Sequence, residues 1–168
     1  MTIHEFNLQK EEELQKSLEK CCGSKTWIFQ MISHLPFNNK EEILMESDRI
    51  WNNCTEDDCL EAFQHHPKIG DINSLKEKYN QTKSWAKGEQ SGVQEASENI
   101  LQALSEGNKQ YEVKFGFIFI VCATGKSAVE MLALLEQRLH NNYEKEIKIA
   151  MQEQGKITKI RLQKLIDS

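Results

Sequence analysis

Only one stretch of the chain, residues 115–123, has the aromatic and β-branched composition that is typical of a strand. A lone strand has no partner for its backbone hydrogen-bonding groups, so it cannot found a sheet. The chain also has only 2 prolines and 8 glycines in 168 residues, fewer turn residues than all-β folds usually need. We therefore predict an all-α fold, a single-domain multi-helix bundle with one short extended or irregular apolar segment near residues 115–123.

The apolar residues of the remaining chain recur at the spacing of helical faces. Ser24, Asn39, Thr55 and Ser127 have side chains that cap helix N-termini, so helices are expected to open there. Gly107 is expected to end the helix that begins at residue 93. No linker or internal repeat is visible, so one domain over residues 1–168 is expected. Helices are predicted over residues 8–21, 24–34, 72–79, 93–105, 127–139 and 143–165. For the two helices that open at Asn39 and Thr55, the sequence predicts the start.

The charge balance bears on the partners of the protein. The formal net charge is -5, with 26 acidic and 21 basic side chains. This balance argues against nucleic acid and anionic membranes as main partners, because both bind basic surfaces. A small anionic substrate remains compatible with it, since local charge decides such binding.

The five cysteines are an odd number without Cys-x-x-Cys spacing. They resemble neither a disulfide framework nor a zinc site, so a reducing compartment fits best. Residues 1–13 are polar and acidic, and no signal peptide is visible. The longest strongly apolar stretch, residues 115–123, is too short to cross a bilayer. The expected location is the cytoplasm.

A histidine next to a proline is the first candidate for chemistry. His65 and His66 end a predicted helix, and Pro67 and Gly70 follow them. Histidine titrates near neutral pH, and Pro67 fixes the backbone and biases His66 away from the helical conformation. Two interpretations stay open: a proton-transferring group held in one pose, or a cation that caps the end of the helix.

A carboxylate and a carboxamide form the second candidate. Glu89 and Gln90 lie side by side between Gly88 and Gly92. Glu89 can act as a base, and Gln90 can donate and accept hydrogen bonds. The pair also suits a solvated helix N-terminus, where the helix dipole stabilises a glutamate in the first turn.

The third candidate is Arg161, which falls near the middle of the expected inward stripe of the last helix, alongside Gln154. A guanidinium on an inward face must be paired with an anion. That anion is either a buried carboxylate of the protein or a ligand that carries a carboxylate. The other members of the stripe are Ile147, Met151, Thr158 and Leu165.

Four motifs occur in order along nearly the whole chain. They are His66-Pro67-Lys68-Ile69-Gly70, Trp85-x-x-Gly88-Glu89-Gln90, Phe115-Gly116-Phe117-x-Phe119-Ile120-x-Cys122-Ala123-x-Gly125-Lys126, and Arg161-Leu162. Together these motifs closely resemble those of the 2-oxo-4-hydroxy-4-carboxy-5-ureidoimidazoline decarboxylase family of uric acid breakdown.

The resemblance implies an all-helical homodimer that binds a small ureidoimidazoline substrate and needs no metal or organic cofactor. Carried over, His66 is the catalytic imidazole and Glu89 is its carboxylate partner. Members of the family often carry a serine at the position of Ala86, and Ser84 and Ser91 are the two candidates to replace it here. The residues expected to line the substrate pocket are Pro67, Ser84, Gln90, Phe119, Ile120, Val121, Cys122, Ala123 and Arg161.

The implied activity is that of a carboxy-lyase whose product is (S)-allantoin. The substrate's carboxylate lies next to an imine carbon of its own ring, which takes up the electrons as carbon dioxide leaves, so no cofactor is needed as an electron sink. His66, aided by Glu89, is expected to move the proton. Backbone donors near Ile120 and Val121 are expected to stabilise the developing charge, and Arg161 to orient the carboxylate or the ureido group.

Two alternatives from other classes remain. A non-catalytic helical interaction module explains the composition, and it predicts a large exposed apolar patch without an enclosed polar pocket. A nucleotide-binding protein would use Gly125-Lys126-Ser127, which resembles the end of a phosphate-binding loop. That loop needs a glycine where this chain has Ile120, and the simpler interpretation is a turn with Ser127 as an N-cap.

Overall fold

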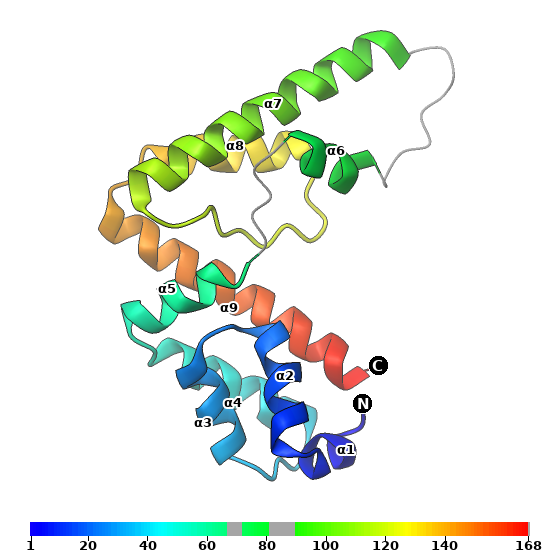
Figure 1. Cartoon of the computed structure of the whole chain (residues 1–168), viewed down its shortest axis with the longest axis vertical. Coiled ribbons are helices and arrows are strands. Elements are labelled where there is room, and N and C mark those ends of the chain that lie inside the picture. Colours follow the sequence, from blue (N-terminus) through cyan, green and yellow to red (C-terminus); the bar gives the residue numbers. More distant parts are fainter. Residues whose placement is uncertain (67–71, 81–89, 168) are drawn as a thin grey trace. The chain divides into compact units, whose positions relative to one another are not determined.

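The computed structural model of the chain describes residues 1–66, 72–80 and 90–167, whose course Figure 1 shows. Within these ranges the regular structure is entirely helical. The all-α prediction is therefore confirmed. The helices are α1 (Ile3–Leu8), α2 (Glu11–Cys21), α3 (Lys25–Ser33), α4 (Lys40–Asn52), α5 (Glu56–Gln64), α6 (Ile72–Asn80), α7 (Gln90–Phe115), α8 (Ala128–Leu139) and α9 (Tyr143–Asp167).

Residues 116–127 join α7 to α8 without a strand or a helix. Phe117, Ile120 and Cys122 of this segment are buried. The predicted extended or irregular apolar segment is thus observed, except that Phe115 still belongs to α7.

Capping side chains open four helices where the sequence predicts them. The side chains of Ser24, Asn39, Thr55 and Ser127 each accept a hydrogen bond from the backbone N–H three residues further on. Thr55 and Ser127 complete capping boxes with the acidic side chain at that position. Each cap stabilises its helix by about 1 kcal/mol.

Two predicted helix bounds are wrong. Gly107 does not end α7, because it lies under Leu135 of α8: a Cβ atom at position 107 would stand 2.7 Å from Leu135 Cδ2. The glycine permits close helix packing there, and packing outweighs its low helix propensity. The helix expected over residues 8–21 is instead α1 and α2, because Thr2 caps a separate short helix with a capping box.

The chain divides into two compact units. The first comprises Met1–His66, Ile120–Cys122 and Ile147–Ser168, and the second comprises Pro67–Phe119 and Ala123–Glu146. Each unit is described by itself below, and the expectation of one domain over residues 1–168 stays a prediction.

The core of the first unit forms around α3, which contacts α2, α4 and α5. Trp27 is fully buried, and its indole N–H donates to the Ser47 carbonyl at 3.3 Å. Trp51 of α4 donates its indole N–H to the Met151 carbonyl of α9 at 2.8 Å, which fixes these two helices together. Further fully buried side chains of this core are Phe6, Leu14, Leu18, Ile43, Ile50 and Leu162.

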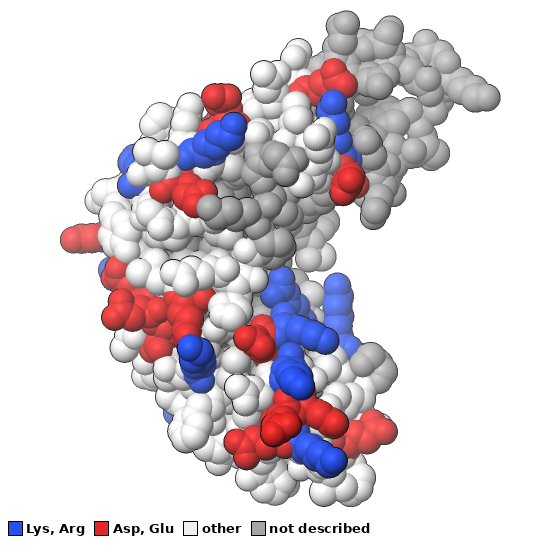
Figure 2. Space-filling model, viewed as in Figure 1, with Lys and Arg blue, Asp and Glu red and all other residues white. Residues whose placement is uncertain are grey.

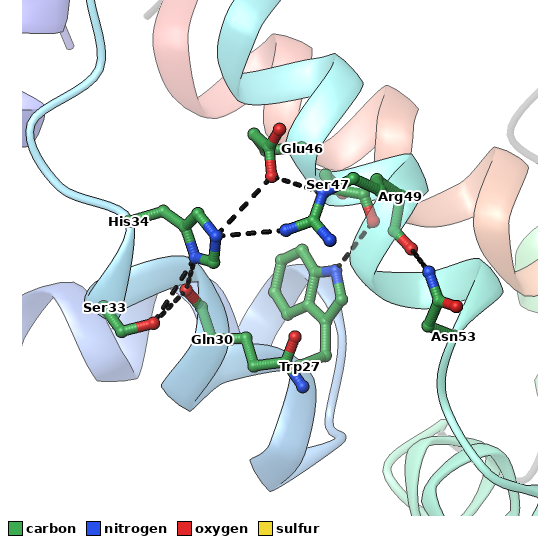
Figure 3. Close-up of polar contacts among 8 residues, drawn as sticks. All are labelled: Trp27, Gln30, Ser33, His34, Glu46, Ser47, Arg49 and Asn53. Atoms are coloured by element: carbon green, nitrogen blue, oxygen red, sulfur yellow. Dashed lines mark hydrogen bonds and ion pairs between the residues drawn. The ribbon is translucent and has the colours of Figure 1, made fainter.

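On the surface of the first unit, His34 joins α3 to α4 through a polar cluster (Figure 3). Its Nδ1 lies 2.7 Å from the Gln30 carbonyl, and its Nε2 lies 3.0 Å from a guanidinium nitrogen of Arg49. A carbonyl only accepts and a guanidinium only donates, so this arrangement places a ring proton of His34 on Nδ1. Arg49 also donates to Glu46 at 2.8 Å.

In the second unit, α7 contacts α6 and α8, and a buried charged network joins three of its side chains. This charged network consists of Tyr111, Arg138 and Glu146. Arg138 Nε donates to Glu146 at 2.6 Å, and the Tyr111 hydroxyl donates to the same carboxylate. Asn141 donates to its other oxygen at 3.0 Å. Burial, then the bond to Glu146, raises the pKa of Tyr111, so the phenol stays protonated.

Candidate active site

His66 lies just beyond the C-terminus of α5, where its backbone N–H donates to the Phe63 carbonyl at 3.2 Å. Its ring Nε2 is hydrogen-bonded to the Gln154 carboxamide oxygen, 88 residues along the chain on α9. Gln154 is fully buried, and its amide nitrogen donates to the Thr158 hydroxyl at 3.1 Å. We call Thr158, Gln154 and His66 the neutral network, because none of its members requires a charge.

A pocket of about 260 Å³ opens beside His66 within the first unit. Its walls come from α2, α5 and α9 and from the connection that follows α2. Two of the predicted site residues, His66 and Arg161, meet in it. The lining residues are Glu19, Lys20, Gly23, Ala62, His65, His66, Gln154 and Arg161.

Arg161 is half-buried at the edge of this pocket, not at the centre of an inward stripe. The buried row of α9 runs through Gln154, Thr158 and Leu162, four residues apart, which leaves Arg161 to one side. Its guanidinium donates to the Lys20 carbonyl at 3.0 Å. No carboxylate of the described residues forms an ion pair with it, and both interpretations, a carboxylate of the protein and a carboxylate of a ligand, stay open.

His65 packs next to the pocket without a short polar bond. A Cβ atom at position 23 would stand 2.3 Å from His65 Cγ, so only glycine admits the ring there. His65 Nδ1 lies 3.8 Å from a Glu19 carboxylate oxygen. These contacts fix the residue that precedes His66 on the chain, and so they restrict where the His66 ring can lie.

The surroundings of His66 favour its neutral form. Burial lowers the pKa of His66 below its ordinary value of 6.5. The hydrogen bond that His66 makes to the Gln154 carboxamide oxygen opposes this shift, and the charges of Arg161 and His65 add to it. At neutral pH the ring is therefore an imidazole with one bare nitrogen, which is the form that can accept a proton.

The segment expected to hold substrate divides between the two units. Ile120, Val121 and Cys122 belong to the first unit, and Phe119 and Ala123 to the second. The Cys122 N–H donates to the Glu153 carboxylate of α9 at 2.8 Å, so this backbone donor already has a protein acceptor. The Phe119 ring lies in the second unit, 4.6 Å from the Arg138 guanidinium carbon.

Several predicted site residues lie outside the described residues. They are Pro67, Ser84 and Glu89, and also Gln90, whose backbone opens α7 but whose side chain is not described. The pairing of His66 with Glu89 and the choice between Ser84 and Ser91 therefore stay predictions.

Sequence reasoning missed the role of Gln154. It placed this glutamine on the inward stripe of the last helix but gave it no partner. The signal was present, because a buried carboxamide must find hydrogen-bond partners. What the sequence could not supply was the identity of the partner, since His66 comes from a distant helix end.

The phosphate-loop alternative gains nothing from the geometry. Gly125 lies in a turn at φ 75°, closed by a bond from the Lys126 N–H to the Ala123 carbonyl at 3.0 Å. Ser127 caps α8, as the simpler interpretation predicted. Within the described ranges, no three His, Cys, Asp or Glu side chains gather so as to hold a metal ion.

On the face drawn in Figure 2, the acidic and basic side chains of the described residues lie interspersed. Among the described helices, none combines the length and the apolar character that a bilayer crossing demands.

An all-helical fold that holds an imidazole, a carboxamide and a guanidinium in one polar pocket defines a class of protein: one that binds a small molecule beside an acid–base side chain. The sequence identifies the family within this class. Residues 7–163 match the model of OHCU decarboxylase, and the chain belongs to this family. OHCU abbreviates 2-oxo-4-hydroxy-4-carboxy-5-ureidoimidazoline.

Individual relatives agree with this assignment. The uric acid degradation bifunctional protein TTL of Arabidopsis thaliana is 38% identical over 86% of the chain and 45% of its own length. The uric acid degradation bifunctional protein of Bacillus sp. (strain TB-90) is 24% identical over 98% of the chain and 32% of its own length. The chain thus spans less than half the length of these two curated relatives.

Among solved structures, a crystal structure of OHCU decarboxylase in the presence of (S)-allantoin is similar to this chain. The two superpose with a TM-score of 0.73 at 35% identity, and the match covers 95% of this chain and all of the other. The family therefore includes a protein of similar extent and the same helical fold.

Proposed function

We propose that this protein is a cofactor-independent carboxy-lyase that decarboxylates 2-oxo-4-hydroxy-4-carboxy-5-ureidoimidazoline to (S)-allantoin in uric acid degradation. The observation that carries the proposal is the pocket of the first unit. In this pocket the His66 imidazole, whose pKa is lowered by burial, lies near the Arg161 guanidinium. No carboxylate of the described residues forms an ion pair with Arg161. Family membership and the allantoin named for the similar crystal structure support the choice of substrate.

The chemistry needs an anion site and a proton carrier. Arg161 binds the carboxylate or the ureido group, since a guanidinium suits both a carboxylate and a planar acceptor. The bond between the ring carbon and the carboxylate breaks, its electrons enter the neighbouring imine, and carbon dioxide leaves. The imine nitrogen takes up a proton from water. His66, with Glu89 as its proposed partner, takes the proton of the hydroxyl, whose oxygen becomes a carbonyl. It returns a proton to the neighbouring ring carbon that bears the ureido group, which fixes the handedness of the product.

The remaining site assignments extend this proposal. Pro67, Ser84, Gln90, Phe119 and the segment from Ile120 to Ala123 would hold the ring. The Cys122 N–H donates to Glu153. We assign the stabilisation of developing charge to the backbone near Ile120 and Val121. We further propose a cytoplasmic homodimer that acts as one domain. Light scattering at micromolar concentration tests the dimer.

The test of function is a chiral assay. Freshly generated substrate is added to the purified protein, and circular dichroism follows the product, because uncatalysed decay gives racemic allantoin. We expect (S)-allantoin from the wild type. We expect a loss of turnover of roughly 10²–10⁴-fold in His66→Asn, the usual contribution of an acid–base side chain.

His4→Asn is the matched control, since His4 is an exposed histidine of the same unit that lies outside the pocket. It should retain full activity. Full activity in a folded His66→Asn variant would remove His66 from the mechanism. Racemic product from the wild type would remove the decarboxylase function itself and return attention to the helical interaction module.

A further inference from the structure

Only one nitrogen of a neutral histidine ring can accept a proton. In His66, the hydrogen bonds of the neutral network decide which of the two ring nitrogens this is. The Nε2 atom is hydrogen-bonded to the Gln154 carboxamide oxygen. An amide oxygen only accepts hydrogen bonds, so Nε2 must carry the ring proton in this arrangement. The Nδ1 atom then carries the lone pair.

The orientation of the Gln154 carboxamide decides the argument, because an amide turned by half a rotation would present N–H groups to His66 instead. Gln154 is fully buried, and its amide nitrogen donates to Thr158, whose side chain is buried as well. The Thr158 hydroxyl therefore accepts the bond from the Gln154 amide, and this bond sets the orientation of the carboxamide.

Burial raises the pKa of the Cys22 thiol to about 12, and the Thr158 hydroxyl is one of the groups that act on it. The donors of the two hydrogen bonds of the neutral network run in one direction: His66 donates to Gln154, and Gln154 donates to Thr158.

We propose that Thr158 and Gln154 act as positioning residues that hold His66 as the Nε2–H tautomer, so that Nδ1 is the atom that exchanges protons with the substrate. The second half of this statement rests on the proposed function. In the forward step the Nδ1 lone pair takes the proton of the substrate's hydroxyl, and the ring becomes an imidazolium. After carbon dioxide has left, the carbon that carried it becomes a carbonyl, and the imine nitrogen takes up a proton from water. Nδ1 releases its proton to the neighbouring ring carbon, which bears the ureido group, and the neutral Nε2–H ring is restored.

A carboxamide differs from a carboxylate in this position. It fixes the tautomer as a carboxylate would, yet it carries no charge to stabilise the imidazolium. The ring can thus stay neutral while its geometry is fixed. His34 shows the opposite choice within the same unit, since its Nδ1 faces a carbonyl and its Nε2 is left as the acceptor (Figure 3).

The direct test is the tautomer itself. Long-range ¹H–¹⁵N correlation spectra of the full chain with ¹⁵N-labelled histidine distinguish a protonated from a bare ring nitrogen, and comparison with His66→Asn assigns the signal. Without substrate, at a pH where the ring is neutral, we expect His66 with Nε2 protonated and Nδ1 bare. A dominant Nδ1–H form in the wild type would overturn the proposal.

Variants test the supporting residues. Thr158→Val keeps the shape but removes the acceptor of the Gln154 amide, so both tautomers should appear in the spectrum. Thr158→Ser keeps the hydroxyl and should restore the single form. Gln152→Leu, an exposed change two residues from Gln154, is the matched control and should leave the spectrum unchanged. A single unchanged tautomer in Thr158→Val would remove Thr158 from its role.

Kinetics test the catalytic half. In Gln154→Leu we expect kcat to fall by roughly 10-fold to 100-fold, part of the usual acid–base contribution, while KM changes little. The acidic limb of the kcat/KM profile should move to lower pH, because the bond that raises the pKa of His66 is lost. If Gln154→Leu kept the kcat of the wild type and the same pH for the acidic limb of kcat/KM, the proposal would be contradicted.

Failure of this inference and failure of the proposed function give different results. A wild type that shows the expected tautomer but forms no (S)-allantoin contradicts the function and leaves the tautomer assignment standing. A wild type that forms (S)-allantoin from an Nδ1–H ring contradicts the assignment and leaves the function standing.

Discussion

Each of the two units buries a polar network. The networks differ in their formal charge and in whether one end borders a pocket. The charged network of the second unit pairs Arg138 with Glu146 and adds the Tyr111 hydroxyl, all three side chains being buried. The neutral network of the first unit has no formal charge and ends at His66, which borders a pocket. The members of the charged network bond to one another, whereas the neutral network ends at a side chain that a ligand can reach.

The difference separates a structural from a functional use of buried polar groups. Removing one member of a buried ion pair leaves an uncompensated charge, which is costly. Removing a neutral hydrogen-bond partner costs less, but it frees the ring that the partner orients. We therefore expect changes in the charged network to act on stability, and changes in the neutral network to act mainly on chemistry.

The largest expected effect on stability is that of Glu146→Gln. The substitution leaves the buried Arg138 guanidinium without its counter-ion, so the free energy of unfolding should fall by about 3–5 kcal/mol. Urea denaturation measures it. Glu144→Gln, an exposed change on the same helix, should cost less than about 0.5 kcal/mol. Equal losses in the two variants would show that the ion pair does not hold the unit together.

A smaller loss is expected from Tyr111→Phe. The ring remains, but Glu146 loses one of its donors, while Arg138 and Asn141 still bond to it. The free energy of unfolding should fall by about 1–3 kcal/mol, the range for leaving a buried acceptor short of a partner. Thermal or urea unfolding checks it. An unchanged midpoint would mean that the remaining donors satisfy the carboxylate fully.

Thr158→Val should cost about 1 kcal/mol, because it removes one hydrogen bond between neutral groups and keeps the packing. The same urea titration measures it, with Thr158→Ser as the control that retains the hydroxyl. A loss as large as that of Glu146→Gln would erase the distinction between the two networks.

The smallest expected effect depends on pH. Burial lowers the pKa of His66 in the folded state below 6.5, so the folded protein binds fewer protons here than the unfolded chain does. This residue's contribution to stability is then full above about pH 6.5 and is lost as the pH falls through the folded-state pKa. His66→Asn lacks this loss, so its stability relative to the wild type should improve from about pH 7 to pH 5.

Tyr111→Phe supplies the comparison for this pH experiment. The pKa of Tyr111 is raised and lies far above the same window, so its variant should differ from the wild type by a constant amount there. Urea midpoints at several pH values measure both variants. A constant difference for His66→Asn would mean that the ring titrates equally in the folded and unfolded states.

Local features of the fold could be predicted from the sequence, and close packing could not. The caps at Ser24, Asn39, Thr55 and Ser127 depend on residues three positions apart, so the chain itself specifies them. Whether α7 ends or continues at Gly107 depends instead on packing against the Leu135 side chain of another helix. A glycine that ends a helix and one that admits a neighbour look the same in a sequence.

The candidate site divides in the same way. A histidine before a proline and an arginine on the last helix are visible as unusual residues, and the structure brings His66 and Arg161 to one pocket. The link between His66 and Gln154 spans 88 residues and depends on how α5 and α9 pack. The sequence indicates that such a glutamine needs a partner, but only the fold says which.

Arg161 also completes the end of another helix. Arg161 donates to the Lys20 carbonyl, which is one of the last four carbonyls of α2. The last four carbonyls of a helix accept no hydrogen bond from within the helix, so they need partners from elsewhere. Occupancy of the pocket and fraying of that last turn are therefore thermodynamically linked. A ligand that draws the guanidinium away should speed amide exchange just beyond α2, and a ligand that leaves it in place should slow that exchange.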